Sequence, residues 1–200
     1  MLTEERLVAV VVTPSIAEAA PPGVDAAAFL TAVAEDTYEL VAGLDFVSPV
    51  LVTSVPGMEE IVWPGTPVVE IPDLSGEALV RAAFAALPYG GQAVLLSGDA
   101  PDLPPLLIGK LFRQLGRAQV AVCPAADGGA VAIAAHLPYP DWAGTGFDDH
   151  DPVKALRAAA PGPRTVATGP GWHRLRTPDD IARLDPGLEG WDNTRALLSA

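Results

Sequence analysis

The sequence predicts an α/β protein of three layers, in which helices cover both faces of a mixed, mainly parallel sheet. Two observations carry this prediction. Short apolar runs alternate with helical patterns through the first 115 residues, as in parallel strands joined by crossover helices. An Asp127-Gly128-Gly129 turn then separates two further apolar runs, and this hairpin signal adds an antiparallel element. Residues 1–200 suit a single domain, without an internal repeat or a linker.

Each expected element rests on a local pattern. Apolar, β-branched runs predict strands, and an amphipathic run behind a capping residue predicts a helix. Asp25, Ser75 and Asp151 precede three such runs and are expected to cap them. In chain order, the pattern predicts strand 7–12, helix 26–42, strand 50–53, strand 68–71, helix 76–87, strand 93–96, helix 105–115, strand 120–123, strand 130–135, helix 151–160, strand 165–168 and a short helix over 177–184.

The composition excludes several functional classes. Half of the residues are hydrophobic, which indicates a folded globular chain. The net charge is −13, and no Lys or Arg lies between Arg6 and Arg81, so binding to nucleic acid or to an anionic membrane is not expected. No segment has the ~20 apolar residues that span a bilayer. The start of the chain is unlike a signal peptide, and Cys123 is the only cysteine, so we expect a cytoplasmic location. The oligomeric state stays open.

The strongest candidate site lies in the segment VLLSGDAPDLPP, residues 94–105. A buried strand ends there in a loop that contains Asp99 and Asp102. Open α/β sheets bind ligands at the carboxyl ends of their strands, and carboxylates hold Mg²⁺ or Mn²⁺ against a diphosphate. Asp99 is therefore expected to ligate such a metal or to contact a ribose. Asp102 precedes a helical pattern and is also a candidate helix cap.

Three motifs together resemble a known family. They are GDAPDLPP with Asp99, CPAADGG with Asp127, and TPDD at 177–180. From about Leu7 to Leu184 the chain resembles the DUF2064 family, candidate glycosyltransferases of the nucleotide-diphospho-sugar transferase superfamily with the Rossmann-like GT-A fold. The resemblance implies a glycosyl- or nucleotidyltransferase that uses a nucleotide or nucleotide-sugar donor with Mg²⁺ or Mn²⁺. It implies that Asp99 is catalytic and binds the metal, that Asp102 supports substrate binding, and that catalytic Asp127 with Gly128 and Gly129 borders the acceptor.

Two segments depart from the family pattern. In the family a loop with Gly and Lys or Arg follows the first strand and grips the phosphates, whereas residues 10–27 have no basic residue and include Glu18. Arg174 and Arg176 stand where the family has two acids. Either an arginine replaces the charge of the metal and binds the substrate phosphate, or the metal site is lost. In the second case the protein is a catalytically inactive relative that serves in binding or assembly.

Structural interpretations stay open beside these. Glycines supply the positive φ of hairpin turns, so Asp127-Gly128-Gly129 also fits a plain turn. Arg174 and Arg176 also fit a surface pair ahead of a helix cap. The run Asp148-Asp149-His150-Asp151 has the composition of a metal site, but consecutive side chains cannot all point inward, and capping of the next helix is the favoured interpretation.

Overall fold

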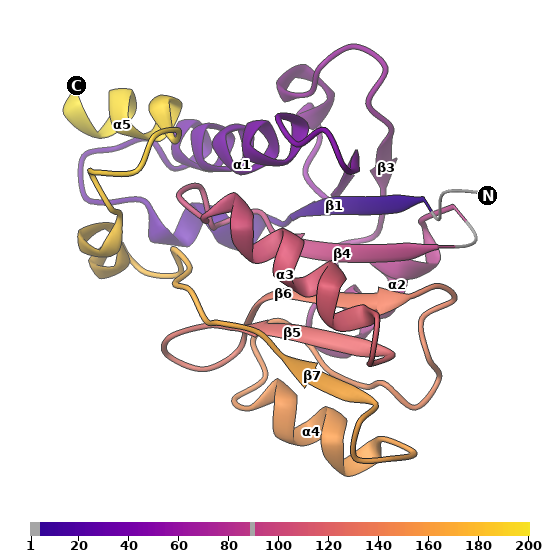
Figure 1. Cartoon of the computed structure of the whole chain (residues 1–200). Coiled ribbons are helices and arrows are strands. Elements are labelled where there is room, and N and C mark those ends of the chain that lie inside the picture. The colour runs from indigo at the N-terminus through magenta and orange to yellow at the C-terminus, as the bar shows by residue number, and fades with distance from the viewer. Residues whose placement is uncertain (1–4, 89–90) are drawn as a thin grey trace.

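The computed structural model describes residues 5–88 and 91–200, and it confirms the three-layer α/β architecture (Figure 1). The strands form one sheet in the order β3-β2-β1-β4-β6-β5-β7. The strands are β1 (Arg6–Val12), β2 (Ser48–Thr53), β3 (Val68–Glu70), β4 (Gln92–Ser97), β5 (Val120–Pro124), β6 (Ala130–His136) and β7 (Val166–Thr168). The helices are α1 (Ala26–Ala42), α2 (Gly76–Ala85), α3 (Pro105–Leu115), α4 (Pro152–Ala159) and α5 (Asp192–Ser199), with short 3-10 helices η1 (Pro14–Ala19), η2 (Met58–Ile61) and η3 (Pro178–Arg183).

The sheet is mixed, as predicted. Strands β1 to β4 run parallel to one another, with Val10 beside Leu96 across the β1–β4 pair. The predicted hairpin forms: β6 is antiparallel to both β4 and β5, so β5 runs in the same direction as β4. Strand β7 is parallel to β5. Every strand except β6 therefore ends at the same edge of the sheet.

Two hydrophobic clusters fill the space above and below the sheet. One contains the apolar side chains of α1 and α3, including the fully buried Phe29 and Ile108. The other contains those of α2 and α4, including Phe84 and Leu156. Helix α5 lies beside α1 (Figure 1), where Asp36 of α1 accepts hydrogen bonds from its first turn. Among the described residues, no helix combines the length and apolar character needed to cross a membrane.

The strand order reverses beside β1. The chain moves outward from β1 through β2 to β3, and then returns to the other side of β1 to form β4. At such a switch point the connections leave in opposite directions, which opens a crevice outside the carboxyl ends of the two central strands. Thr13 follows β1 and Asp99 follows β4, so both lie at this crevice.

The capping predictions had mixed outcomes. The carboxylates of Asp25 and Asp151 accept from the amides of Ala28 (2.8 Å) and Lys154 (2.9 Å), as expected for caps. Ser75 precedes α2, but its side chain makes no capping hydrogen bond. Asp102 as a helix cap was wrong, because α3 begins behind Pro104. The short helix expected over 177–184 is the 3-10 helix η3, and η1 lies between the predicted strand 7–12 and helix 26–42, where no element was predicted.

Candidate functional site

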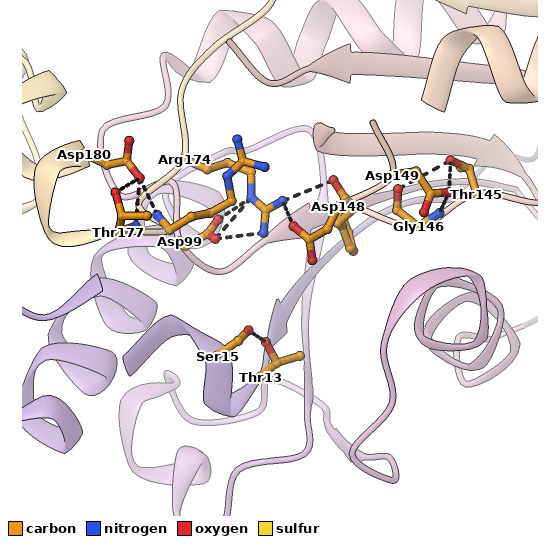
Figure 2. Close-up of polar contacts among 12 residues, drawn as sticks. Thr13, Ser15, Asp99, Thr145, Gly146, Asp148, Asp149, Arg174, Thr177 and Asp180 are labelled. Atoms are coloured by element: carbon orange, nitrogen blue, oxygen red, sulfur yellow. Dashed lines mark hydrogen bonds and ion pairs between the residues drawn. The ribbon is translucent and has the colours of Figure 1, made fainter. Parts of the chain in front are cut away.

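A buried ion pair between Asp99 and Arg174 forms the centre of the candidate site (Figure 2). The Arg174 Nε atom lies 2.9 Å from Asp99 Oδ1, and its Nη2 atom lies 2.9 Å from Asp99 Oδ2. The two residues are only 7% and 3% exposed. This side-by-side contact is the strong, bidentate form of the arginine–carboxylate pair. It shows that Arg174 is not one of a pair of surface arginines.

The other end of the guanidinium contacts the segment before α4. Arg174 Nη1 donates to a carboxylate oxygen of Asp148 (2.7 Å) and to the Phe147 carbonyl (3.2 Å). Burial lowers the pKa of Arg174, but Asp99 and Asp148 more than offset this and raise it above its ordinary value. A guanidinium carries five N–H groups, and these contacts use four. One hydrogen on Nη2 has no acceptor among the residues that the structure describes.

Backbone contacts place Asp99 beside Arg174. Gly98 comes directly after β4 and lies against β1, where its amide donates to the Val11 carbonyl at 2.8 Å. A Cβ on this residue would lie 2.8 Å from the same oxygen. Only glycine fits this approach. The Leu175 amide then donates to the Asp99 carbonyl (2.9 Å), which fixes the segment carrying Arg174 against the loop.

The predicted Asp127-Gly128-Gly129 turn supports the site from the side. Gly128 and Gly129 have φ values of +92° and +87°, which glycine adopts readily. The Gly129 amide and the Ala130 amide donate to the carbonyls of His150 (3.4 Å) and Phe147 (2.8 Å). A Cβ on Gly129 would lie 2.4 Å from the Phe147 oxygen. The turn therefore holds Phe147 and Asp148 where Arg174 can reach them.

A cavity of about 310 Å³ opens next to this ion pair at the switch point, and we call it the carboxyl-edge pocket. Its polar lining includes hydroxyls from several connections at this edge, those of Thr13, Ser15, Ser75 and Ser97. The hydroxyl oxygens of Thr13 and Ser15 lie 2.8 Å apart and share a hydrogen bond (Figure 2). Hydroxyls both donate and accept, so the pocket suits a ligand rich in hydroxyl groups.

The charged lining of the carboxyl-edge pocket is mostly acidic. It contains Glu18, Asp73 and Asp148, and Arg174 is the only Lys or Arg among the described residues that line it. The segment after β1 has no basic residue, and it contributes only Thr13, Pro14, Ser15 and Glu18 to the lining of the pocket. Each added negative charge on a ligand raises the repulsion from these carboxylates, while one guanidinium attracts it.

Asp102 lies behind the site as a structural tie. Its carboxylate accepts from Trp172 Nε1 (3.1 Å), lies 2.9 Å from His173 Nε2 and accepts from the Asp185 amide (3.1 Å). The residue is 3% exposed. These contacts fasten the segment after β7 to the acidic loop, and the role of Asp102 in substrate binding stays a prediction.

Asp127 borders a different, more open pocket. It forms an ion pair with Arg183 of η3, and both line a cavity of about 500 Å³ together with Trp172 and His173. We call this cavity the hairpin pocket. Asp99 and Asp127 were each predicted to be catalytic. The structure places Arg174 and Asp148 around Asp99, and Arg183 beside Asp127. A catalytic role for either stays a prediction.

Arg176 and the acidic residues nearby have separate positions. Arg176 is partly exposed, and one of its guanidinium nitrogens would lie 3.4 Å from a Cβ on Gly129. Asp180 accepts from the amides of Arg176 (2.9 Å) and Thr177 (2.8 Å). Asp149 accepts from the Gly146 amide at 2.7 Å, so two members of the acidic run, Asp149 and Asp151, serve local turns and caps.

The residues around Asp99 do not fit a divalent cation as they stand. Both Asp99 oxygens accept from Arg174, so a divalent cation bound to them would lie beside the positive guanidinium. Within residues 5–88 and 91–200, no three His, Cys, Asp or Glu side chains are grouped to hold a metal. Asp148 lies at this site and was not predicted there, because its acidic neighbours favoured helix capping.

One family model matches part of the chain, and that part includes Asp99 and Asp148. Residues 72–148, from the end of β3 to Asp148, match the family model of DUF2064, described as an uncharacterized protein conserved in bacteria. The segment that matches this family model covers less than half of the chain. It contains the Asp99 loop and the β5–β6 hairpin, two of the three motifs on which the resemblance was based. No functionally curated protein matches the chain.

Solved structures share the fold along almost the whole chain. A candidate nucleotide-diphospho-sugar transferase from Desulfovibrio desulfuricans is 18% identical with a TM-score of 0.67, over 98% of both chains. The Rv0371c protein of Mycobacterium tuberculosis, in complex with manganese, is 20% identical with a TM-score of 0.59, over 93% of this chain and 100% of its own. A 4-diphosphocytidyl-2C-methyl-D-erythritol synthase from Anaerococcus prevotii is 13% identical with a TM-score of 0.65, over 90% and 96%. The chain therefore has an α/β fold of the GT-A-like type, and the segment that matches DUF2064 lies within it.

Proposed function

We propose that the protein is a glycosyltransferase-like protein that binds a nucleotide-sugar in the carboxyl-edge pocket. The observation that carries this proposal is the position of the Arg174 guanidinium, fixed in the wall of a pocket at the switch point of a transferase fold. One of its N–H groups has no acceptor among the residues that the structure describes, and we assign this group to a phosphate oxygen. The hydroxyls of Thr13, Ser15 and Ser97 suit the ribose and sugar parts of such a ligand.

The charge of the pocket favours a nucleotide-sugar over a nucleoside triphosphate. A diphosphate ester carries about two negative charges at neutral pH and a triphosphate about four, and each is repelled by Glu18, Asp73 and Asp148. Arg174 already neutralises part of the charge of two carboxylates. We therefore expect the less charged donor to bind more tightly, which places sugar transfer ahead of nucleotidyl transfer.

A second candidate function is that of a catalytically inactive relative that retains the fold for binding or assembly. The bidentate pairing of Asp99 with Arg174 favours it, because a fixed positive charge beside both carboxylate oxygens makes Asp99 a weaker base and a poorer metal ligand. The two candidates differ in turnover. A transferase releases nucleoside diphosphate from the donor when an acceptor is present, and an inactive relative binds the donor and leaves it unchanged.

Calorimetry with UDP-, GDP- and ADP-linked sugars and with the matching triphosphates tests the proposal. Ser15 is exposed at the mouth of the carboxyl-edge pocket, so Ser15→Trp fills it without disturbing the core. Ala126→Trp is the matched control, since Ala126 is exposed at the hairpin pocket. We expect Ser15→Trp to abolish nucleotide-sugar binding and Ala126→Trp to preserve it. The reverse result would move the ligand to the hairpin pocket, and the absence of binding by every nucleotide would refute the proposal.

A further inference from the structure

We infer that Arg174 takes the place of a divalent cation in this protein, so that the carboxyl-edge pocket neither binds Mg²⁺ or Mn²⁺ nor needs them for its ligand. The manganese complex of Rv0371c shows that a protein of this fold holds such an ion. The part of the inference that concerns the ligand rests on the proposed nucleotide-sugar. The part that concerns the metal can be tested without any ligand.

The first argument is that carboxylate oxygens of Asp99 and Asp148 accept hydrogen bonds from Arg174. Asp99 and Asp148 lie on opposite sides of the Arg174 guanidinium, and each has an oxygen within 3 Å of a guanidinium nitrogen (Figure 2). A cation bound to both carboxylates would have to occupy the space of the guanidinium. The positive charge that would neutralise them is therefore already supplied by the chain.

The second argument is that displacement of the Arg174 side chain from this position would cost free energy. Its side chain is 7% exposed, and its Nη1 atom also donates to the Phe147 carbonyl at 3.2 Å. That carbonyl is held in turn by the Ala130 amide at 2.8 Å. A metal ion entering beside the guanidinium would meet a like charge, and one replacing it would remove the hydrogen bond from Arg174 to the Phe147 carbonyl.

The third argument is the chemical likeness of the two groups. A guanidinium presents planar N–H donors to phosphate oxygens in a fixed orientation, and it stays positively charged throughout the pH range of folded proteins. The free Nη2 hydrogen of Arg174 lies on the group that lines the pocket. A diphosphate there would contact a fixed charge of the protein in place of an exchangeable ion.

The test of the metal site uses Mn²⁺ alone, with free Mn²⁺ followed by electron paramagnetic resonance. The proteins are the wild type, Arg174→Asp and the control Arg117→Asp, which makes the same charge change at an exposed site after α3. We expect no binding with a Kd below about 1 mM for the wild type and the control. Arg174→Asp creates a third carboxylate beside Asp99 and Asp148 and is expected to gain one site, at least tenfold tighter. If near-UV circular dichroism shows that Arg174→Asp is unfolded, Arg174→Gln is titrated in its place.

Two results would overturn the inference. One is stoichiometric Mn²⁺ binding by the wild type that disappears in Asp99→Asn. The other is a folded Arg174 variant that gains no Mn²⁺ site, because the guanidinium would then not be what excludes the metal. Nucleotide-sugar calorimetry in EDTA and in Mn²⁺ completes the test, with equal affinity expected. A strict requirement for Mn²⁺ would refute the inference, whereas no binding in either buffer would refute the proposed function and leave the metal titration to decide.

Discussion

Arg174 combines two roles, since it neutralises a buried carboxylate and presents a charge to the pocket. Burial of both partners makes each dependent on the other, because an unpaired charge in the interior carries a large desolvation cost. Function and stability are therefore linked at this residue. Variants that probe the site must be compared with variants that keep the charge balance.

The first prediction concerns the stability of this ion pair. Arg174→Gln leaves the Asp99 carboxylate buried without its partner, and we expect it to lower the free energy of unfolding by about 3–5 kcal/mol. Asp99→Asn with Arg174→Gln removes both charges and is expected to recover part of this loss. Urea unfolding of the two single variants and the double variant measures the coupling.

An exposed ion pair serves as the comparison for that cycle. Arg81 and Glu77 lie one turn apart on α2, with side chains 36% and 52% exposed. Solvent screens such pairs, so Arg81→Gln is expected to cost at most about 1 kcal/mol. Equal losses at Arg81 and Arg174 would contradict the account of the buried pair.

The second prediction concerns pH and Asp180. Burial raises the pKa of Asp180, but the hydrogen bonds from Arg176 and Thr177 and the charge of Arg183 more than offset this and lower it below 3.8. The unfolded chain therefore binds the proton first, and the stabilisation from Asp180 is present above about pH 4 and lost as the pH falls through the lower folded pKa. Urea unfolding between about pH 2.5 and 5 should show a weaker pH dependence for Asp180→Asn. An identical dependence would show that Asp180 contributes nothing to acid unfolding.

At the scale of elements, the contact of the β5–β6 turn with the segment before α4 determines the position of Asp148. The third prediction is that Gly129→Ala disrupts it, since the residue has a positive φ and its Cβ would meet the Phe147 oxygen at 2.4 Å. The backbone strain alone costs about 1–2 kcal/mol, and the steric clash adds to it. Gly65→Ala is the control for strain, because Gly65 has φ +91° with nothing within 4 Å of its Cβ. Equal losses of unfolding free energy would show that the hairpin contact is unimportant.

The fourth prediction concerns the attachment of α5. Asp36 of α1 accepts from the amides of Asn193 (3.0 Å) and Thr194 (2.7 Å), and it replaces a cap that α5 lacks in its own sequence. Asp36→Ala should therefore destabilise this helix by about 1–2 kcal/mol. Hydrogen exchange should rise in residues 192–199 and stay unchanged in α3. Uniform acceleration across the chain would indicate global destabilisation and contradict a local role.

The elements were largely predictable because their signals are local. Alternation of apolar runs, the glycine turn and the caps at Asp25 and Asp151 depend on neighbours in the chain, and the structure has the corresponding strands and helices. Replacement of the metal charge by an arginine was weighed as an alternative. The Arg174–Asp99 contact itself could not be derived, because it joins residues 75 positions apart. Asp148 was missed because its acidic neighbours favoured helix capping, and its contact with Arg174 spans 26 positions. The ties of Asp102 depend on a loop path that no local pattern encodes.

At the scale of the molecule, the protein has a net charge of −13, and the charged residues that line its carboxyl-edge pocket are also mostly acidic. The fifth prediction is that the affinity for a nucleotide-sugar rises with salt. Between about 0.01 M and 0.15 M ionic strength the Debye length falls from about 30 Å to about 8 Å, which screens the distant carboxylates more than the buried Arg174. Calorimetry across this range should show tighter binding that then levels off. A steep fall in affinity would reveal a basic binding surface elsewhere.

The separation of Asp99 and Arg174 along the sequence has a consequence for biosynthesis. The chain emerges from the ribosome in sequence order, so Asp99 is made 75 residues before the arginine that neutralises it. At about 5–20 residues per second, roughly 4–15 seconds separate the two. During this interval β1, β2 and β4 can pair, but the carboxylate beyond β4 must remain hydrated. Asp99 therefore stays exposed to solvent cations until Arg174 has been made, and in the completed chain the two residues are paired.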